Sequence, residues 1–241
     1  LITSGGPCLV TLDRVFVFGM YQKRPGVRGL KIAGLPEGSA VVINHIQGNI
    51  TVSDCSGVVL ARNSYEGTLI VEGRNRGFVG FMTRLTTISD PALIVRDNGN
   101  VVLSDYYVEQ ADRYIVLEGR AGLPPGTVTV GGAKVHLNGP RPLVESKGFA
   151  GRLSFLPAQF YCEPKEALFV SNGRGLLLLF GCCFFYKSLP VFRLPERAPG
   201  VISVCSVGLD DRGANLSAQL SAALDELRRL GRVCWLVSEK G

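Results

Sequence analysis

The chain has 241 residues, of which 46% are hydrophobic and 19% charged, and its formal net charge is +6. The charged fraction lies below the ~25% of an average globular domain, and no run of five basic residues occurs, which argues against a nucleic-acid-binding stripe. The most apolar stretch, residues 176–185, is too short for a membrane-spanning helix, which needs ~20 residues, and predicts a pair of buried strands.

The first residues of the chain and its cysteines give further indications of the class of protein. Residues 1–6 lack the charged region and cleavage site of a signal peptide, and no Met begins the sequence, so we expect a mature or excised part of a longer protein. Seven cysteines lie at irregular spacings without a CxxC or Cys/His ligand pattern. We interpret them as mostly small buried hydrophobic residues, and we expect no metal and no cofactor.

Short apolar segments of β type recur along the chain in two interleaved series. Their centres lie 19–29 residues apart in the first series and 20–27 apart in the second. The first series comprises Thr51, Ile70, Ile94, Ile115, Val144, Phe169 and Phe192. The second comprises Val59, Val79, Val102, Thr129, Ser154, Leu178 and Ser203. Two series that advance together predict a solenoid, whose successive coils stack ~4.8 Å apart as parallel sheets.

Turns and a third strand complete each predicted coil. Polar turns rich in Gly and Asn, which tolerate positive φ at a sharp corner, separate the first two strands. A more polar strand follows at residues 82–87, 104–109, 133–137, 159–163 and 183–187. The sequence therefore predicts an all-β fold, a right-handed parallel β-helix with three strands per coil, over residues 1–206. An antiparallel sandwich is the alternative, but it does not explain why the two series keep step.

The predicted interior and the predicted C-terminal end follow from this register. We expect Ile70, Ile94, Ile115 and Phe169 to form one stacked ladder inside the coils.

Residues 215–230 place leucines at helical spacing on one face, and Gly231 follows as a C-cap. We expect residues 207–241 to cap the solenoid, with this helix covering exposed strand edges and residues 233–237 forming a terminal strand.

Alternation along the third strand of each coil assigns its two faces. The predicted inward residues are Leu85, Tyr106, Val108, Val135, Leu137, Phe160 and Cys162. The outward set, which also includes Arg62, Lys134 and Gln159, mixes rings, cations and carboxylates. Such a stripe suits sugar rings, whose apolar C–H patches are ringed by hydroxyls, and an ordinary solvated face is the alternative. The candidate substrate-binding residues are Arg84, Asp105, Tyr107, Glu109, His136, Tyr161 and Glu163.

The sequence assigns no catalytic residue. Asp105 and Glu109 lie four residues apart on one strand, roughly 13 Å along the backbone. Carboxyl groups of glycoside hydrolases lie ~5–9.5 Å apart, so this pair fits only if its side chains lean together. His136 is the one histidine on the outward face, and a lone surface histidine is more often incidental than catalytic. No phosphate loop, GxSxG or HExxH motif occurs.

Segments such as ALIVRDNGNVVL at residues 92–103 have a strand–turn–strand pattern. This pattern and the coil length together resemble those of a known family. It resembles the pectate-lyase-like right-handed parallel β-helix superfamily, especially bacterial proteins related to glycoside hydrolase families 28 and 55. The resemblance covers residues 8–206. The acidic motifs of that family, an Asn-x-Asp and an adjacent Asp pair, are missing from the coils, and Asp210-Asp211 lies beyond them. The resemblance is one of fold, and it implies a function in carbohydrate binding or cleavage only by analogy with that family.

Two functional classes stay open. The first is a carbohydrate-active β-helix protein, or part of one, that binds or cleaves an extracellular polysaccharide; as an enzyme it would be a glycoside hydrolase or polysaccharide lyase. The second is a non-catalytic structural or binding module of a surface protein, adhesin or phage fibre. We expect a polysaccharide or oligosaccharide partner, no nucleic acid, no membrane, further domains of a longer parent chain, and an extracellular or cell-surface location.

Overall fold

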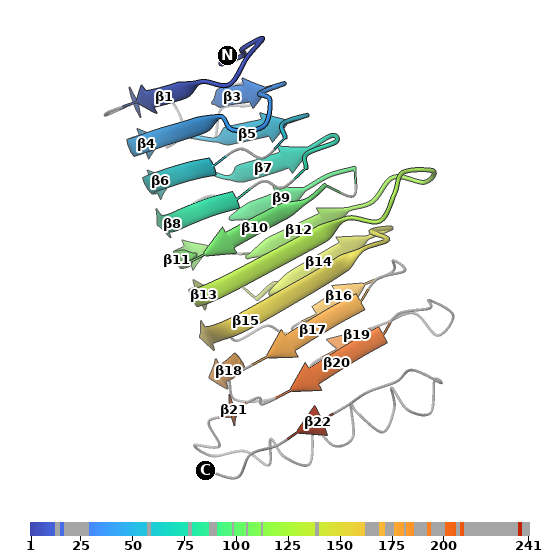
Figure 1. Ribbon diagram of the computed structural model, residues 1–241. Coiled ribbons are helices and arrows are strands. Elements are labelled where there is room, and N and C mark those ends of the chain that lie inside the picture. The colour runs from blue at the N-terminus through green and yellow to red at the C-terminus, as the bar shows by residue number, and fades with distance from the viewer. Residues whose placement is uncertain are drawn as a thin grey trace.

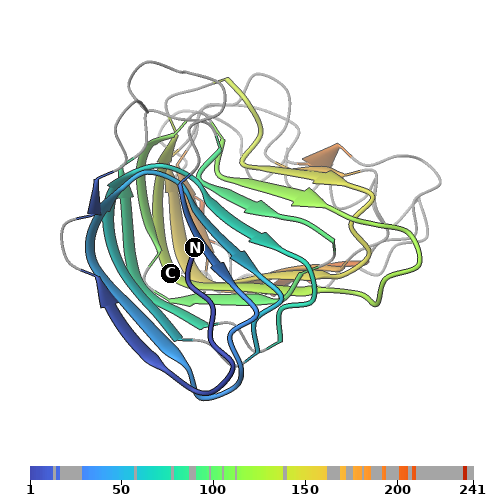
Figure 2. The ribbon, with the colours of Figure 1, turned by 90° about the horizontal axis from the view of Figure 1, so that it is seen from above.

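The structure is a computed structural model in which strands are the regular secondary structure of the described residues. These are residues 1–12, 15–16, 29–56, 59–76, 79–86, 91–97, 99–104, 106–111, 113–137, 140–161, 169–171, 176–180, 182–185, 192–193, 201–205, 208–209 and 236–237. Within them, no helix is long and apolar enough to cross a membrane. The strands wind around a common interior, as the view from above shows (Figure 2).

One sheet has eight strands within the described residues, stacked in chain order (Figure 1). They are β3 (Leu30–Ala33), β5 (Ile50–Ser53), β7 (Leu69–Glu72), β9 (Leu93–Val95), β12 (Ile115–Glu118), β14 (Val144–Lys147), β16 (Phe169–Ser171) and β19 (Phe192–Arg193). Each strand therefore pairs with its counterpart one coil away, and this sheet holds the first strand of each predicted coil.

The second sheet, with fourteen strands in the part of the chain that the structure describes, holds the second and third strands predicted for the coils. Its main path is β1 (Leu9–Leu12), β4 (Ala40–Gln47), β6 (Val59–Glu66), β8 (Val79–Thr86), β10 (Val101–Ser104), β13 (Thr127–Leu137), β15 (Arg152–Tyr161), β17 (Leu176–Phe180), β20 (Val201–Cys205) and β22 (Leu236–Val237). Beside it lie β2 (Val15–Phe16), β11 (Tyr107–Ala111), β18 (Cys182–Phe185) and β21 (Gly208–Leu209). The separate strands β10 and β11 both pair with the single long strand β13. The second and third strands predicted for a coil are thus one continuous strand in β13 and β15.

All pairings between described strands are parallel, which confirms the parallel β-solenoid and excludes the antiparallel sandwich. The second predicted series is in register from its first member to its last. Its neighbouring pairs are Val59 with Val79, Val79 with Val102, Val102 with Thr129, Thr129 with Ser154, Ser154 with Leu178, and Leu178 with Ser203.

The first predicted series loses its register by one residue between Ile94 and Ile115. Ile70 pairs with Ile94, but Ile94 pairs with Val116, and Ile115 pairs with Leu93. Ile70 and Ile94 are half-buried on the outward side, whereas Leu93 is fully buried. The reason is that all three residues of each LIV triplet are apolar, so alternation alone does not say which of them point inward.

The interior of this sheet is built from the residues that flank the predicted ones. One stacked ladder comprises Ile50, Leu69, Leu93, Ile115, Val144 and Phe169, each at most 3% exposed. A second comprises Val52, Val71, Val95 and Leu117. Ile115 and Phe169 are thus interior, as predicted, and Ile70 and Ile94 are not.

Aromatic side chains fill the middle of the interior. The ring of Tyr114 stacks on Tyr106 at 5.6 Å between centroids and lies 6.3 Å from Phe155 and 6.4 Å from Phe160. The Tyr106 hydroxyl donates to the carbonyl of Ala92 at 3.2 Å, whereas the buried Tyr114 hydroxyl has no hydrogen-bond partner among the described residues. Burial, and secondarily the charge of Tyr106, raise the pKa of Tyr114 well above its ordinary value.

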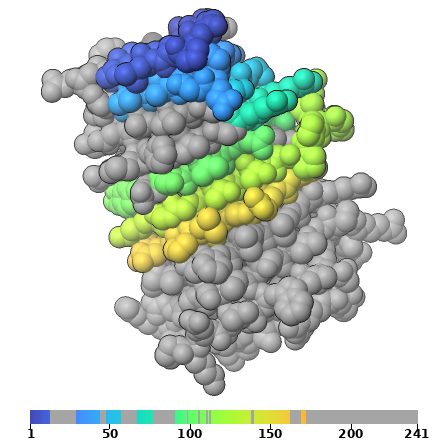
Figure 3. All heavy atoms as spheres, in the orientation of Figure 1, coloured from blue at the N-terminus to red at the C-terminus, as the bar shows by residue number. Residues whose placement is uncertain are grey.

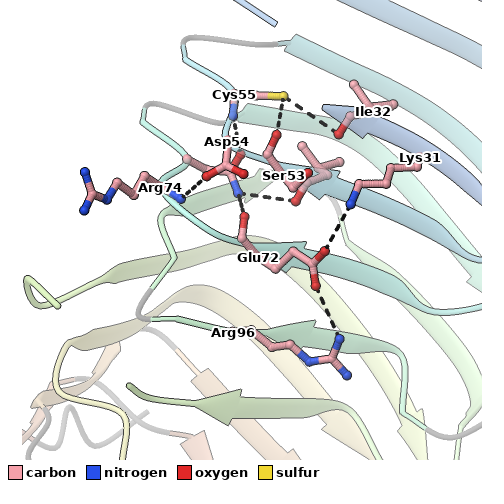
Figure 4. Close-up of polar contacts among 10 residues, drawn as sticks. Lys31, Ile32, Ser53, Asp54, Cys55, Glu72, Arg74 and Arg96 are labelled. Atoms are coloured by element: carbon pink, nitrogen blue, oxygen red, sulfur yellow. Dashed lines mark hydrogen bonds and ion pairs between the residues drawn. The ribbon is translucent and has the colours of Figure 1, made fainter. Parts of the chain in front are cut away.

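The corners between the sheets use aspartate as well as glycine. Asp54 and Asp97 have φ of 53° and 55°, and Gly73 at the corner between them has φ of 74°. The Asp54 carboxylate accepts the backbone N–H of Arg74 at 2.9 Å (Figure 4), and a Cβ on Gly73 would lie 2.4 Å from that carboxylate. Gly73 therefore leaves room for the contact that fixes the Asp54 corner.

The side-chain amides of two asparagines form hydrogen bonds with backbone groups of neighbouring coils. Asn75 is fully buried; its Oδ1 accepts the backbone N–H of Cys55 at 2.8 Å. Its Nδ2 donates to the carbonyls of Glu72 at 2.6 Å and Val52 at 3.3 Å. Asn100 repeats the device one coil on, donating to the carbonyl of Asn75 at 2.9 Å. The expectation that asparagine supplies the positive φ is therefore wrong at Asn75, because buried backbone groups need its amide.

The predicted C-terminal helix, residues 215–230, lies outside the described residues, as does Cys162. Of the predicted terminal strand, Leu236 and Val237 form β22, which pairs with β20 through Val204 and Cys205. The apolar stretch at residues 176–185 forms β17 and β18, as two strands of the fourteen-stranded sheet.

Candidate functional site

The predicted outward stripe lies on β11 and on the C-terminal halves of β13 and β15. Val108, Val135 and Phe160 point inward and are fully buried, as predicted, and so is Tyr106 just before β11. Alternation then turns the intervening side chains outward. We call this outward set the aromatic stripe: Tyr107, Lys134, His136, Gln159 and Tyr161.

Strand pairing fixes two rows within the aromatic stripe. Tyr107 pairs with Arg84 on one side and with Lys134 on the other, and Lys134 pairs with Gln159. His136 pairs with Tyr161 in the second row. Lys134, and not His136, therefore occupies the position of Tyr107 in the next coil. Coil length varies, and the pairing of β11 with β13 contains a register shift after Val108, so counting along the sequence misplaces His136 by two residues.

The rings of the stripe contact one another across coils. His136 and Tyr161 lie parallel, with 4.4 Å between centroids and 6° between planes. The Tyr107 ring lies 6.3 Å from His136 at an interplanar angle of 60°, and the Lys134 ammonium nitrogen lies 5.8 Å from the Tyr161 centroid. His136 and Tyr161 thus cover one face of each other, and at this pair the stripe presents ring edges and polar ends.

The charged candidates are placed only in part. Glu109 is half-buried on β11 and pairs with Thr86. Arg84 has a position in β8 but its side chain is not described, and Asp105 and Glu163 lie outside the described residues. The pairing of Asp105 with Glu109 stays a prediction. Among the described residues, no three His, Cys, Asp or Glu side chains form a group that could hold a metal ion.

Lys134 and Gln159 belong to the stripe although they were not among the candidate binding residues. Both are exposed and both lie in the row of Tyr107. The signal was present in the sequence, because the alternation that turns Tyr107 outward also turns Lys134 and Gln159 outward. The contact of Lys134 with the Tyr161 ring depends on coil stacking and has no local signature.

A second charged cluster lies at the outer side of the eight-stranded sheet. Lys31 is 3.7 Å from Glu72, and Arg96 contacts Glu72 at 3.3 Å (Figure 4). Arg96 also contacts Glu118 at 3.0 Å. Burial lowers the pKa of Arg96, but hydrogen bonds and charges from Glu118 and Glu72 outweigh it, and the pKa is raised. Because cations and carboxylates alternate here, we assign this cluster to coil stability.

Comparisons of the chain with protein-family models, with curated proteins and with solved structures found no match in any of the three.

Proposed function

We propose that this chain binds an extracellular polysaccharide through the aromatic stripe, either as a carbohydrate-active β-helix protein or as part of one. The observation that carries the proposal is the row Tyr107, Lys134 and Gln159, which sets a ring or a polar side chain on each of three successive coils. Stacked coils repeat every ~4.8 Å, close to the ~5 Å of one sugar unit in an extended chain. A linear glycan lying across the coils would meet one such side chain per unit.

The contacts we propose are made mainly at polar ends and ring edges. Lys134 supplies three N–H donors, Gln159 supplies donors and an acceptor, and Tyr161 supplies a hydroxyl. Tyr107, which is tilted against His136 and does not lie parallel to it, supplies the apolar ring for the C–H patch of a sugar. Each contact contributes little alone, so we expect weak affinity spread over several coils.

The finer identity of the fold belongs to the same proposal. A parallel solenoid is compatible with the pectate-lyase-like superfamily, which the chain resembles in coil length, and we propose right-handed coils of that type. The carboxylates near the stripe, Asp105, Glu109 and Glu163, are the groups we propose for hydrolysis or elimination if the parent protein is an enzyme. Binding is the part of the proposal that the described side chains support, and we propose an extracellular or cell-surface location.

A structural module is the second candidate, and a specific contact favours it. The parallel stacking of His136 on Tyr161 joins two coils, and such aromatic pairs add ~0.5–1.5 kcal/mol beyond the area they bury. In this alternative the stripe stiffens a stalk or fibre and binds nothing.

The test is retention of the purified chain on immobilised polysaccharides, neutral (xylan, mannan) and acidic (polygalacturonate). The double variant Tyr107→Ala/Tyr161→Ala should keep the circular dichroism of the wild type and lose retention. Tyr161→Phe keeps the stack with His136 but removes the hydroxyl, so it should weaken retention. Val102→Ala, at an exposed position of the same sheet, is the control. If no polysaccharide retains the wild type, or the double variant binds equally well, the structural module is the better account.

A further inference from the structure

Residues 1–12, which we call the end segment, lie at one end of the stacked coils, where Figure 3 shows them in dark blue. Val10 and Leu12 of β1 are half-buried and pack against the core, whereas their partners in β4, Val41 and Ile43, are at most 1% exposed. An interior position is fully covered only when a coil lies on each side of it. Within the described residues, the apolar interior of the solenoid is therefore open at this end.

The outer edge of β1 has no partner strand among the described residues, because β1 is the last strand of its sheet. The Cys8 carbonyl accepts the backbone N–H of Ala40 at 2.8 Å, so Cys8 directs its backbone groups toward β4. Alternate residues of a strand bond to the same neighbour. The backbone N–H and C=O groups of Leu9 and Thr11 therefore point to the open edge.

The end segment lacks the features that protect an exposed strand edge. Its sequence, LITSGGPCLVTL, contains no charged side chain. Leu1 and Leu9 are 82% and 73% exposed, more than any other large hydrophobic residue that the structure describes. The pairing of β1 with β4 is regular over all four residues, without a bulge. Edge strands are normally protected by lysine, proline or a bulge, and the terminal repeat of a solenoid by a polar outer face.

A second copy of the same edge is the partner that fits this chemistry. A two-fold axis brings β1 against β1 in antiparallel order, and because the edge is uncharged, no like charges meet. Leu9 of each copy then lies opposite Thr11 of the other. Such a pair exchanges both of its N–H···O bonds, since both residues direct these groups to the edge. Val10 of one copy faces Val10 of the second copy on the inward side, so each interior closes the other.

We propose that two copies of this chain pair through β1, end segment against end segment, and form one sheet that continues across a two-fold axis. The proposal does not depend on glycan binding, because the aromatic stripe lies on β11, β13 and β15, away from this edge. The pairing sets two aromatic stripes on one rod, and two linked binding sites retain a polymer more strongly than one.

The experiment is sedimentation velocity of the full chain over about a hundredfold range of concentration, because mass action governs a dimer. We expect the wild type to be a dimer that dissociates on dilution. Thr11→Pro removes an N–H that points to the open edge and no bond to β4, and Leu9→Lys sets like charges opposite each other across the axis. Each should raise the dissociation constant at least about tenfold.

Matched controls separate a lost interface from a lost fold. Thr11→Val keeps the edge N–H and the absence of charge, and Val102→Lys introduces the same charge at a valine of the same sheet that is 36% exposed. Both should remain dimeric. Circular dichroism at a concentration where the wild type is monomeric should be the same for all variants. Amide exchange of Leu9 and Thr11 should be slow in the wild-type dimer and fast in Val102→Lys only after dilution.

Three results would overturn the inference. A wild type that stays monomeric at every concentration means that two copies do not pair through this edge. A dimer that survives both Thr11→Pro and Leu9→Lys uses another surface. Growth beyond the dimer shows a head-to-tail contact, because a two-fold pairing closes after two copies. None of these results bears on polysaccharide retention, which tests the proposed function separately.

Discussion

The guanidinium group of Arg96 donates to the Glu118 carboxylate at 3.0 Å and thereby joins two successive coils. The same group reaches back to Glu72 at 3.3 Å, so one side chain connects three coils. The pairs are partly exposed, with Arg96 at 42% and Glu118 at 40%. The alternation of charge along the solenoid axis is what makes this contact favourable despite solvent screening.

Replacing Arg96 by Ala should lower the free energy of unfolding by about 1 kcal/mol, because partly exposed ion pairs contribute ~0–1 kcal/mol each. The loss should shrink in 1 M salt, where the Debye length falls to ~3 Å. Urea unfolding at low and high salt measures both effects. Lys31→Ala is the matched control: among the described residues Lys31 forms one ion pair, with Glu72 at 3.7 Å, so the effect of its loss should be smaller. A larger loss for Lys31→Ala would contradict the three-coil role of Arg96.

Leu93 and Ile94 are adjacent residues of β9 with opposite roles. Leu93→Ala should destabilise by about 2–5 kcal/mol, because it empties a fully buried position between Leu69 and Ile115. Ile94→Ala removes a half-buried outward side chain and should lose at most about 1 kcal/mol. Chemical denaturation of the two variants compares them directly. Equal losses would mean that the register of β9 is wrong.

The buried hydroxyls of Tyr114 and Tyr106 make a second matched pair. Tyr114→Phe should raise the free energy of unfolding by about 1 kcal/mol, since it removes a buried hydroxyl without a partner among the described residues. Tyr106→Phe should lower it by a similar amount, because the bond to the Ala92 carbonyl is lost. Thermal melts at neutral pH test both signs. A destabilised Tyr114→Phe would show that this hydroxyl has a partner in solution.

The raised pKa of Tyr114 predicts a loss of stability in alkali. In the unfolded chain a tyrosine ionises near pH 10, while the folded protein keeps Tyr114 neutral. The folded state then binds more protons, so the free energy of unfolding falls as the pH rises above about 10. Below that pH the contribution is fully present. Denaturant unfolding between pH 8 and 11 should show a steeper decline for the wild type than for Tyr114→Phe; identical slopes would contradict the assignment.

The sequence predicted the stacking of coils better than the direction of individual side chains. The second series was right throughout because several of its strands carry polar residues such as Thr129 and Ser154, which mark the outward side. In the LIV triplet at residues 93–95 every position is apolar, and only the stacking of Leu93 on Ile115 decides that Leu93 points inward.

The sequence predicted which residues of the aromatic stripe face outward, but not how their side chains are arranged in rows. Alternation turned Tyr107, His136 and Tyr161 outward correctly. The rows, however, depend on the bend at Gly132 and on the register shift between β11 and β13, and neither has a fixed length in the sequence. For the same reason the parallel contact of His136 with Tyr161 was not foreseen. Such a contact forms between residues 25 positions apart.

The unbroken register of Val79, Val102 and Thr129 has a consequence for how such a chain changes length. Each of these residues meets only the coil before it and the coil after it, and all three present the same edge to their neighbours. Cutting out residues 102–128 would bring Thr129 against Val79 with the same parallel pairing, leaving a shorter rod whose ends are unaltered. The length of this solenoid can therefore change by one coil at a time, because the two coils that flank a deleted coil can pair with each other.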